Sequence, residues 1–148
     1  MELIDLTVAG VHLLFGGLWT GSILFVTVAV LPTARDGTID SEPLARVTSR
    51  FTTIARSSAL VTLATGAYWA SAYDVGKLVE TTEGKLVVAM VLLWIGLGAL
   101  SEIGAARLAD GTDKRKVRTP ATEARPFFLV GSLLAVALLL DAGALAIL

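Results

Sequence analysis

The sequence predicts an all-α membrane protein, built as an up-and-down bundle of four transmembrane helices. Hydrophobic residues make up 55% of the 148 residues, charged residues only 17%, and the mean hydropathy is +0.76. In a soluble domain, about a quarter of the residues are charged. The run from Leu6 to Ala34 holds no ionisable side chain except His12, and about 20 helical residues cover the hydrocarbon core. Strand alternation is weak, and backbone groups in lipid must pair internally, so the spans are expected to be helices.

The first two spans are predicted at residues 3–31 and 51–73. The first is expected to close at Pro32, because proline lacks a backbone N–H. The second contains Arg56, and it is preceded by Ser41-Glu42-Pro43. This triplet is typical of an N-cap and a first helical turn, so the helix is expected to start before the membrane.

The last two spans are predicted at residues 86–106 and 126–148. The third contains Glu102, and Gly111 is expected to stop its helix in the left-handed conformation that glycine tolerates. Pro126 is expected to bend the entry of the fourth helix. The sequence shows neither a convincing repeat nor a second domain, so the whole chain is predicted to form one transmembrane domain.

The basic residues predict the orientation in the membrane. The loop between the second and third spans holds only Lys77 and Lys85, whereas the other ten of the 12 basic residues lie in or beside the first and third loops. Lys and Arg gather on the cytoplasmic side. We therefore expect a multi-pass protein of the cell membrane with both termini outside. The start lacks a basic segment, so the first span is expected to be retained rather than cleaved.

The composition also excludes several classes of function. A net charge of −1 predicts no nucleic-acid partner, and the absence of cysteine excludes disulfides, thiolate metal sites and thiol nucleophiles. One histidine cannot supply both axial ligands of a haem. The sequence carries neither a phosphate-binding loop nor a metalloprotease motif. We therefore expect a non-enzymatic protein, with the lipid bilayer as its first partner.

His12, Asp141 and Met90 are expected to gather in the outer half of the bundle. His12 lies about 14 Å below the outer end of the first helix, and Asp141 about 10 Å below that of the fourth, at 1.5 Å per residue. These helices are neighbours in an up-and-down bundle, so His12 and Asp141 are expected to meet. Trp19 shares the helical stripe of His12 and is, with Asp141, a candidate second-shell or proton-relay residue, and Met90 lies in the same half as His12. Two interpretations remain open: a packing hydrogen bond, or a metal ligand with Asp141 as its second-shell carboxylate or as a proton relay.

Arg56 and Glu102 form a second predicted pair, in the inner half. Each lies about 8 to 9 Å from the cytoplasmic end of its helix, and the two helices form a hairpin. A buried bidentate pair would neutralise both charges. It is interpreted as a structural pair or as snorkelling side chains, with an inner gate that breaks during transport as the alternative.

Two segments resemble the membrane domain of the copper resistance D (CopD) family. The first is Val11-His12-Leu13-Leu14-Phe15-Gly16-Gly17-Leu18-Trp19-Thr20-Gly21, followed by Phe25 and Pro32; the second is Arg50-Phe51-Thr52-Thr53-Ile54-Ala55-Arg56, followed by Thr65-Gly66. The likeness covers roughly residues 8–108, and the fourth helix is too generic to count. The acidic, lysine-poor composition is similar to that of haloarchaeal members.

The resemblance implies copper transport or copper handling. Among the motif residues only His12 is suited to bind metal, and Cu(I) favours imidazole and thioether ligands, so Met90 and Met1 join it as candidate ligands. A complete site would require a second copy or a partner membrane or copper-binding protein. The alternatives are a haem-associated subunit, and a structural or assembly subunit with no transport activity of its own.

Overall fold

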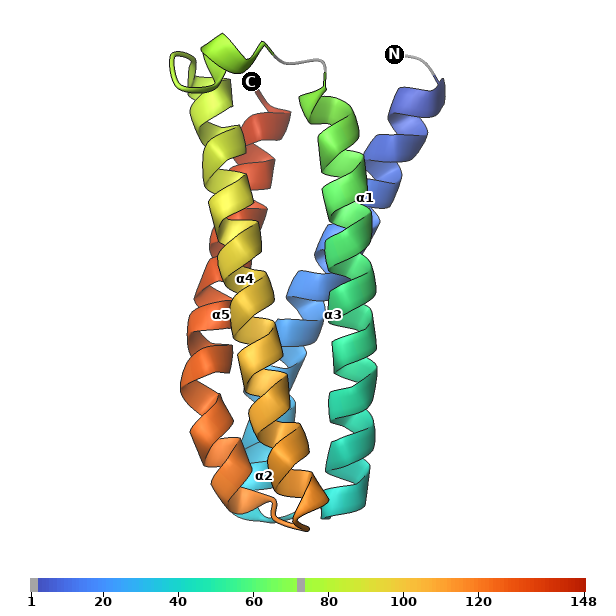
Figure 1. Ribbon diagram of the computed structural model, residues 1–148, viewed down its shortest axis with the longest axis vertical. Helices are drawn as coiled ribbons and strands as arrows, with labels where there is room; N and C mark the ends of the chain where they lie inside the picture. The colour runs from blue at the N-terminus through green and yellow to red at the C-terminus, as the bar shows by residue number, and fades with distance from the viewer. Residues whose placement is uncertain (1–2, 72–73) are drawn as a thin grey trace.

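The computed structural model describes residues 3–71 and 74–148 (Figure 1). These residues form helices and turns, and no strand occurs among them, so the predicted all-α class is confirmed. The elements are α1 Leu3–Phe25, a π-helical turn Val26–Val30, α2 Leu31–Asp36, α3 Ser41–Ala70, a 3-10 turn Val75–Leu78, α4 Thr82–Asp113 and α5 Arg118–Ala146.

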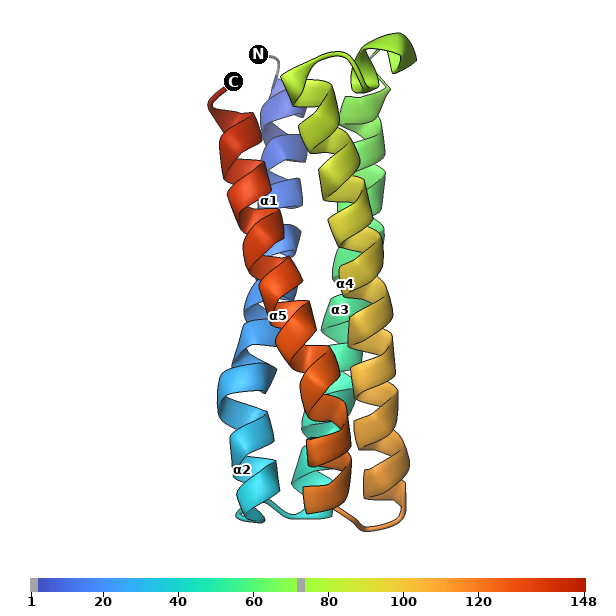
Figure 2. The ribbon, with the colours of Figure 1, turned by 90° about the vertical axis from the view of Figure 1, so that its left-hand side faces the viewer.

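The four long helices run up and down along one axis (Figures 1 and 2). The start of α1 and the end of α5 lie at the same end of the bundle as the 3-10 turn that precedes α4. We call this the outer end, following the predicted orientation, and the opposite end the inner end. Three stretches are long and apolar enough to cross a membrane, namely Leu3–Asp36, Thr82–Asp113 and Arg118–Ala146.

Helix α3 is as long as these stretches but richer in hydroxyl side chains. Six of its hydroxyls donate to carbonyls four residues earlier in the same helix, those of Thr48, Thr52, Thr53, Ser57, Thr62 and Thr65. A hydroxyl that is paired in this way leaves no polar hydrogen unsatisfied in lipid. That α3 is the remaining span stays a prediction, and this pairing is compatible with it.

The sequence predicts that the first helix ends at Pro32, but in the structure the helix continues past this residue. The backbone N–H of Leu31 bonds to the carbonyl of Val26, five residues earlier, and the helix continues through α2 to Asp36. Because proline has no N–H, and its ring crowds the preceding turn, one widened turn accommodates it without breaking the helix. The helix ends instead at Gly37, whose φ is +73°.

Gly111 does not end the helix α4 either. The helix continues to Asp113, and Arg115 takes the left-handed conformation with φ 55°. The N–H groups of Arg115 and Lys116 bond to the carbonyls of Thr112 and Gly111, which is the Schellman arrangement. A Cβ at position 111 would collide with the ring of Pro120, so glycine is required here for close approach of α5.

Helix α1 crosses the bundle from α3 at the outer end to α5 at the inner end (Figures 1 and 2). Near its outer end, Asp5 accepts a hydrogen bond of 3.0 Å from Tyr68 of α3. Farther in, the hydroxyl of Thr27 lies 2.7 Å from that of Ser132 and 3.1 Å from the carbonyl of Phe128, both on α5. This tilt decides which helix faces His12.

Among the described residues, fully buried side chains are concentrated in the inner part of the bundle, and the outer part is less closely packed. The large buried side chains include Trp19, Ile23, Leu44, Leu97 and Phe128. Apart from Gly84, the outermost buried residues of the four long helices in the described part of the chain are Trp19, Thr62, Leu97 and Ala135. His12, Met90 and Asp141 all lie in this outer part, and all three are half-buried.

Candidate functional site

His12 contacts α3 through two adjacent residues. Its Nδ1 lies 2.7 Å from Oγ1 of Thr65. Gly66 lies against the edge of the ring, where a Cβ would be 3.5 Å from Cε1. The tilt of α1 brings the imidazole to this point, and a glycine there leaves room for it. The Thr65-Gly66 pair thus forms the surface of α3 that the imidazole contacts.

The hydrogen bonds of Thr65 are compatible with a neutral His12 ring that carries its proton on Nδ1. The Thr65 hydroxyl donates to the carbonyl of Val61 at 2.7 Å, and a carbonyl can only accept. With its single hydrogen engaged there, the hydroxyl accepts from Nδ1–H of His12. In this tautomer the lone pair of Nε2 is free. An imidazole held by one N–H is typical of metal-ligating histidines.

Two tryptophans lie below His12 and close the outer part of the bundle. Trp19 of α1 and Trp94 of α4 pack edge to face, with ring centroids 6.3 Å apart and an angle of 82° between planes. The indole N–H of Trp94 donates to Oγ1 of Thr62 at 3.1 Å. Trp19 is 2% exposed, and its Nε1 is buried without a partner. The pair forms an apolar layer between the open outer part and the dense inner core.

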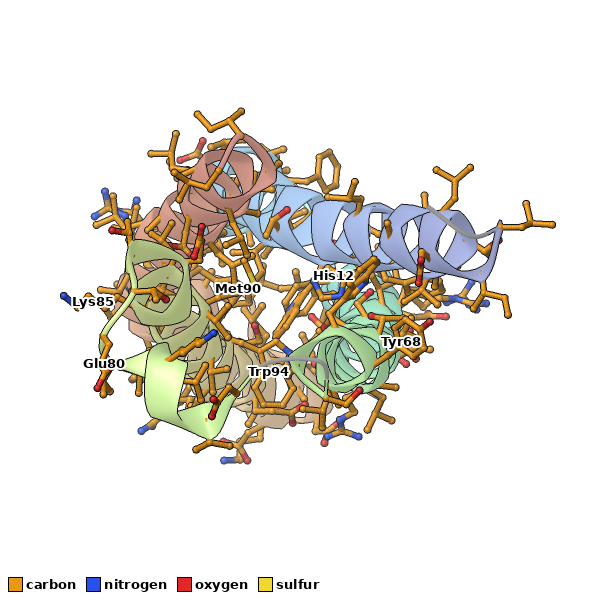
Figure 3. The ribbon with its side chains drawn as sticks, turned by 90° about the horizontal axis from the view of Figure 1, so that it is seen from above. His12, Tyr68, Glu80, Lys85, Met90 and Trp94 are labelled. Atoms are coloured by element: carbon orange, nitrogen blue, oxygen red, sulfur yellow. The ribbon has the colours of Figure 1, made fainter. Side chains whose placement is uncertain are left out.

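Met90 and Trp94 lie one turn apart on α4 and face the interior of the bundle. Figure 3 views the molecule from the outer end: Met90 and Trp94 lie on the inner side of α4, and His12 lies across the interior from Met90. Tyr68, Glu80 and Lys85 lie at the periphery in the same view. The structure thus directs one imidazole and one thioether towards the same interior. Met1, the third predicted ligand, lies outside the described residues.

The predicted hydrogen bond between His12 and Asp141 is not formed. Thr65 takes the place of Asp141, because the tilt of α1 carries His12 towards α3 and away from α5 (Figures 1 and 3). Oδ2 of Asp141 is buried and has no hydrogen-bond partner. A buried carboxylate oxygen without a partner is costly. Asp141 therefore contributes an unsatisfied acceptor to the outer part of the bundle.

Arg56 and Glu102 meet as predicted, but they are not buried. Nε and Nη2 of Arg56 donate to the two oxygens of Glu102, both at 2.8 Å. The side chains are 65% and 47% exposed, so the prediction of a buried pair is wrong. The helical hairpin aligns the two residues in depth, yet both project outward from α3 and α4. This position does not suit a gate, which has to close a passage between helices.

The described residues hold no cluster of three or more His, Asp or Glu side chains that could bind a metal ion. The free Nε2 of His12 and the sulfur of Met90 are ligands of the kind that soft Cu(I) prefers. This set fits a weakly held soft cation better than a closed structural metal site. The sequence interpretation missed Thr62 and Thr65, although Thr65 stands within the motif and at the depth of His12.

A family model described as CopD, copper resistance protein D, matches residues 45–145, more than half of the chain. The match includes the fourth helix, which we had considered too generic, and begins after the first helix, where the resemblance to the family is most apparent. His12 therefore precedes the matched residues, and its role rests on geometry. No curated protein and no solved structure matches the chain.

Proposed function

We propose that this chain, which belongs to the copper resistance protein D family, binds copper in the outer part of its bundle and takes part in copper transport across the cell membrane. It is a membrane protein of a copper-resistance family. Copper is its cargo and not a resident cofactor. We further propose that α3 is the fourth span, that both termini lie outside and that the chain has no enzymatic activity.

The observation that carries the proposal is the hydrogen bond between His12 and Thr65. It orients the only histidine of the chain and leaves its Nε2 lone pair available. An intramembrane ionisable residue is a functional candidate in its own right. Here the residue also lies above the tryptophan pair, in the part of the bundle that the core does not fill.

Met90 and Asp141 complete the proposed site. Met90 supplies a thioether, which Cu(I) accepts readily together with imidazole. Asp141 supplies a negative charge that partly offsets a bound cation, or it takes up a proton when the cation enters. Its buried oxygen without a partner supports this role. Met1 is proposed as a further thioether ligand.

The proposal is tested by His12→Ala, by Met90→Leu and by a matched control, Leu14→Ala. Leu14 lies on the same helix and is 66% exposed. The purified protein is titrated with Cu(I) against a chelator that competes for it, and copper uptake is measured in cells. We expect His12→Ala to lose binding and uptake, Met90→Leu to bind more weakly, and the control to match the parent. Unchanged binding by His12→Ala would overturn the proposal.

A structural role of His12 is the alternative, and the same hydrogen bond supports it because it joins α1 to α3. Membrane hydrogen bonds of this kind contribute about 0.6 to 2 kcal/mol. Under this alternative, His12→Leu, which keeps the volume and removes the polarity, lowers thermal stability while copper binding is absent from the parent as well. Metal per chain after growth with copper separates the two.

A further inference from the structure

The pair of Arg56 and Glu102 lies on the membrane-facing surface of α3 and α4, at a depth where lipid tails are expected. On α3, Arg50 and Tyr68 mark the two interfaces, and the 18 residue steps from one to the other span about 27 Å, close to the hydrocarbon thickness of about 30 Å. Arg56 lies six residues beyond Arg50, or about 9 Å into this layer. The side chains of the pair are 65% and 47% exposed.

Charged side chains at this depth face protein or water, because exposure to lipid is costly. The neighbouring exposed positions on α3 are mixed: the hydroxyls of Thr53 and Ser57 are bonded within their own helix, and Leu60 is apolar and 67% exposed. The outer surfaces of α1 and α5 present large apolar residues such as Leu13 and Leu133, which are 66% and 70% exposed, and α4 likewise exposes Leu92 and Ile95, at 65% and 54%. The feature of this face that is unsuited to lipid is thus the exposed ion pair itself.

We propose that a second copy of this chain covers this face, in a dimer whose two-fold axis is parallel to the membrane normal. Two copies that are inserted with the same orientation form a closed dimer only around a two-fold axis of this direction. When two such faces meet, the α3 side of one copy opposes the α4 side of the other. Arg56 of one copy therefore meets Glu102 of the second copy at the same depth, and the interface is self-complementary in charge.

The surface beside Glu102 permits close contact. Ala99 and Ala106 precede and follow Glu102 on the same side of α4, and both are exposed. Small residues at a membrane interface allow the backbones of two helices to approach. In the dimer, two guanidinium groups and two carboxylates form one network away from lipid, and each carboxylate gains a second cationic neighbour.

The first test uses single cysteines, because the chain has none of its own. Leu60→Cys places a thiol one turn from Arg56 on the exposed side of α3, and Leu133→Cys places one on the lipid-facing side of α5; the residues are 67% and 70% exposed. Both variants are treated in native membranes with a short bis-maleimide. We expect a cross-linked dimer for Leu60→Cys and none above background for Leu133→Cys. Equal cross-linking of both variants, or a product with a different protein, would overturn the proposal.

The second test separates contact between copies from the pair within one copy. Arg56→Glu makes the pair wholly acidic, and Glu102→Arg makes it wholly basic, so the ion pair within each copy is lost in both variants. Expressed alone, each variant is expected to lose the dimer. Co-expressed with different tags, they are expected to co-purify as a heterodimer, since opposite charges now face each other only between copies. Failure to co-purify, with both variants folded, would overturn the proposal. Neither test depends on copper, so the dimer stands or falls separately from the proposed function.

Discussion

Replacing Thr65 by valine tests whether the imidazole of His12 is held for metal binding. The substitution keeps the shape of the side chain and removes the hydroxyl that lies 2.7 Å from Nδ1. Loss of a second-shell partner typically lowers metal affinity by about 10-fold to 100-fold. The hydrogen bond itself contributes about 0.6 to 2 kcal/mol in a membrane, which corresponds to about 3-fold to 30-fold. The two ranges overlap between about 10-fold and about 30-fold, and we expect a decrease in Cu(I) affinity within this overlap.

The assay is a competitive Cu(I) titration of the purified variant, combined with thermal unfolding. The control is Thr52→Val, because the Thr52 hydroxyl donates to the carbonyl of Thr48 at 2.9 Å, within its own helix. We expect the control to keep the parent affinity. If Thr65→Val binds Cu(I) as tightly as the control does, the assignment of the free Nε2 as the ligand atom is wrong. If it only melts at a lower temperature, His12 serves packing.

Three further predictions concern single side chains. Gly111→Ala is expected to destabilise the fold by about 1 to 3 kcal/mol, because a Cβ at this position collides with the ring of Pro120. The control is Gly143→Ala, because a Cβ there meets nothing within 4 Å, and thermal unfolding measures the stability of both variants. Asp141→Leu is expected to raise thermal stability by removing a buried acceptor without a partner, and to lower copper uptake; a stable variant with normal uptake would exclude Asp141 from the site. Trp94→Phe, which removes the 3.1 Å bond to Thr62, is expected to cost about 0.6 to 2 kcal/mol; an unchanged melting temperature would show that this bond contributes nothing.

The number of long helices, their up-and-down arrangement and the pairing of Arg56 with Glu102 follow from the sequence. Hydropathy sets the positions of the helices along the chain, and a hairpin places residues of equal depth side by side. Whether that pair faces inward could not be predicted in this way. Depth along a helix depends on the rise per residue, whereas the direction of a side chain depends on how the helix is rotated against its neighbours.

The partner of His12 could not be predicted, because it depends on the tilt of a helix. In an idealised bundle, the first and fourth helices remain in contact along their whole length, and His12 would then meet Asp141. In the structure, the widened turn at Val26–Val30 and the bond between Thr27 and Ser132 hold the inner part of this helix against α5. Its outer part crosses to α3 instead. The role of Gly111 is equally hard to predict from the sequence, because glycine is found at the ends of helices and also where two helices approach closely.

The difference in packing along the axis separates binding of copper from its passage. On the inner side of His12 lie the paired rings of Trp19 and Trp94. Below these rings, Ile23 and Leu97 are almost fully buried, at 1% and 0% exposed. A route through one copy would have to open this core, which is packed as closely as other protein interiors. Within the proposed function, copper bound at His12 lies outward of this core, and its passage requires either movement of the tryptophan pair or a route that the second copy provides.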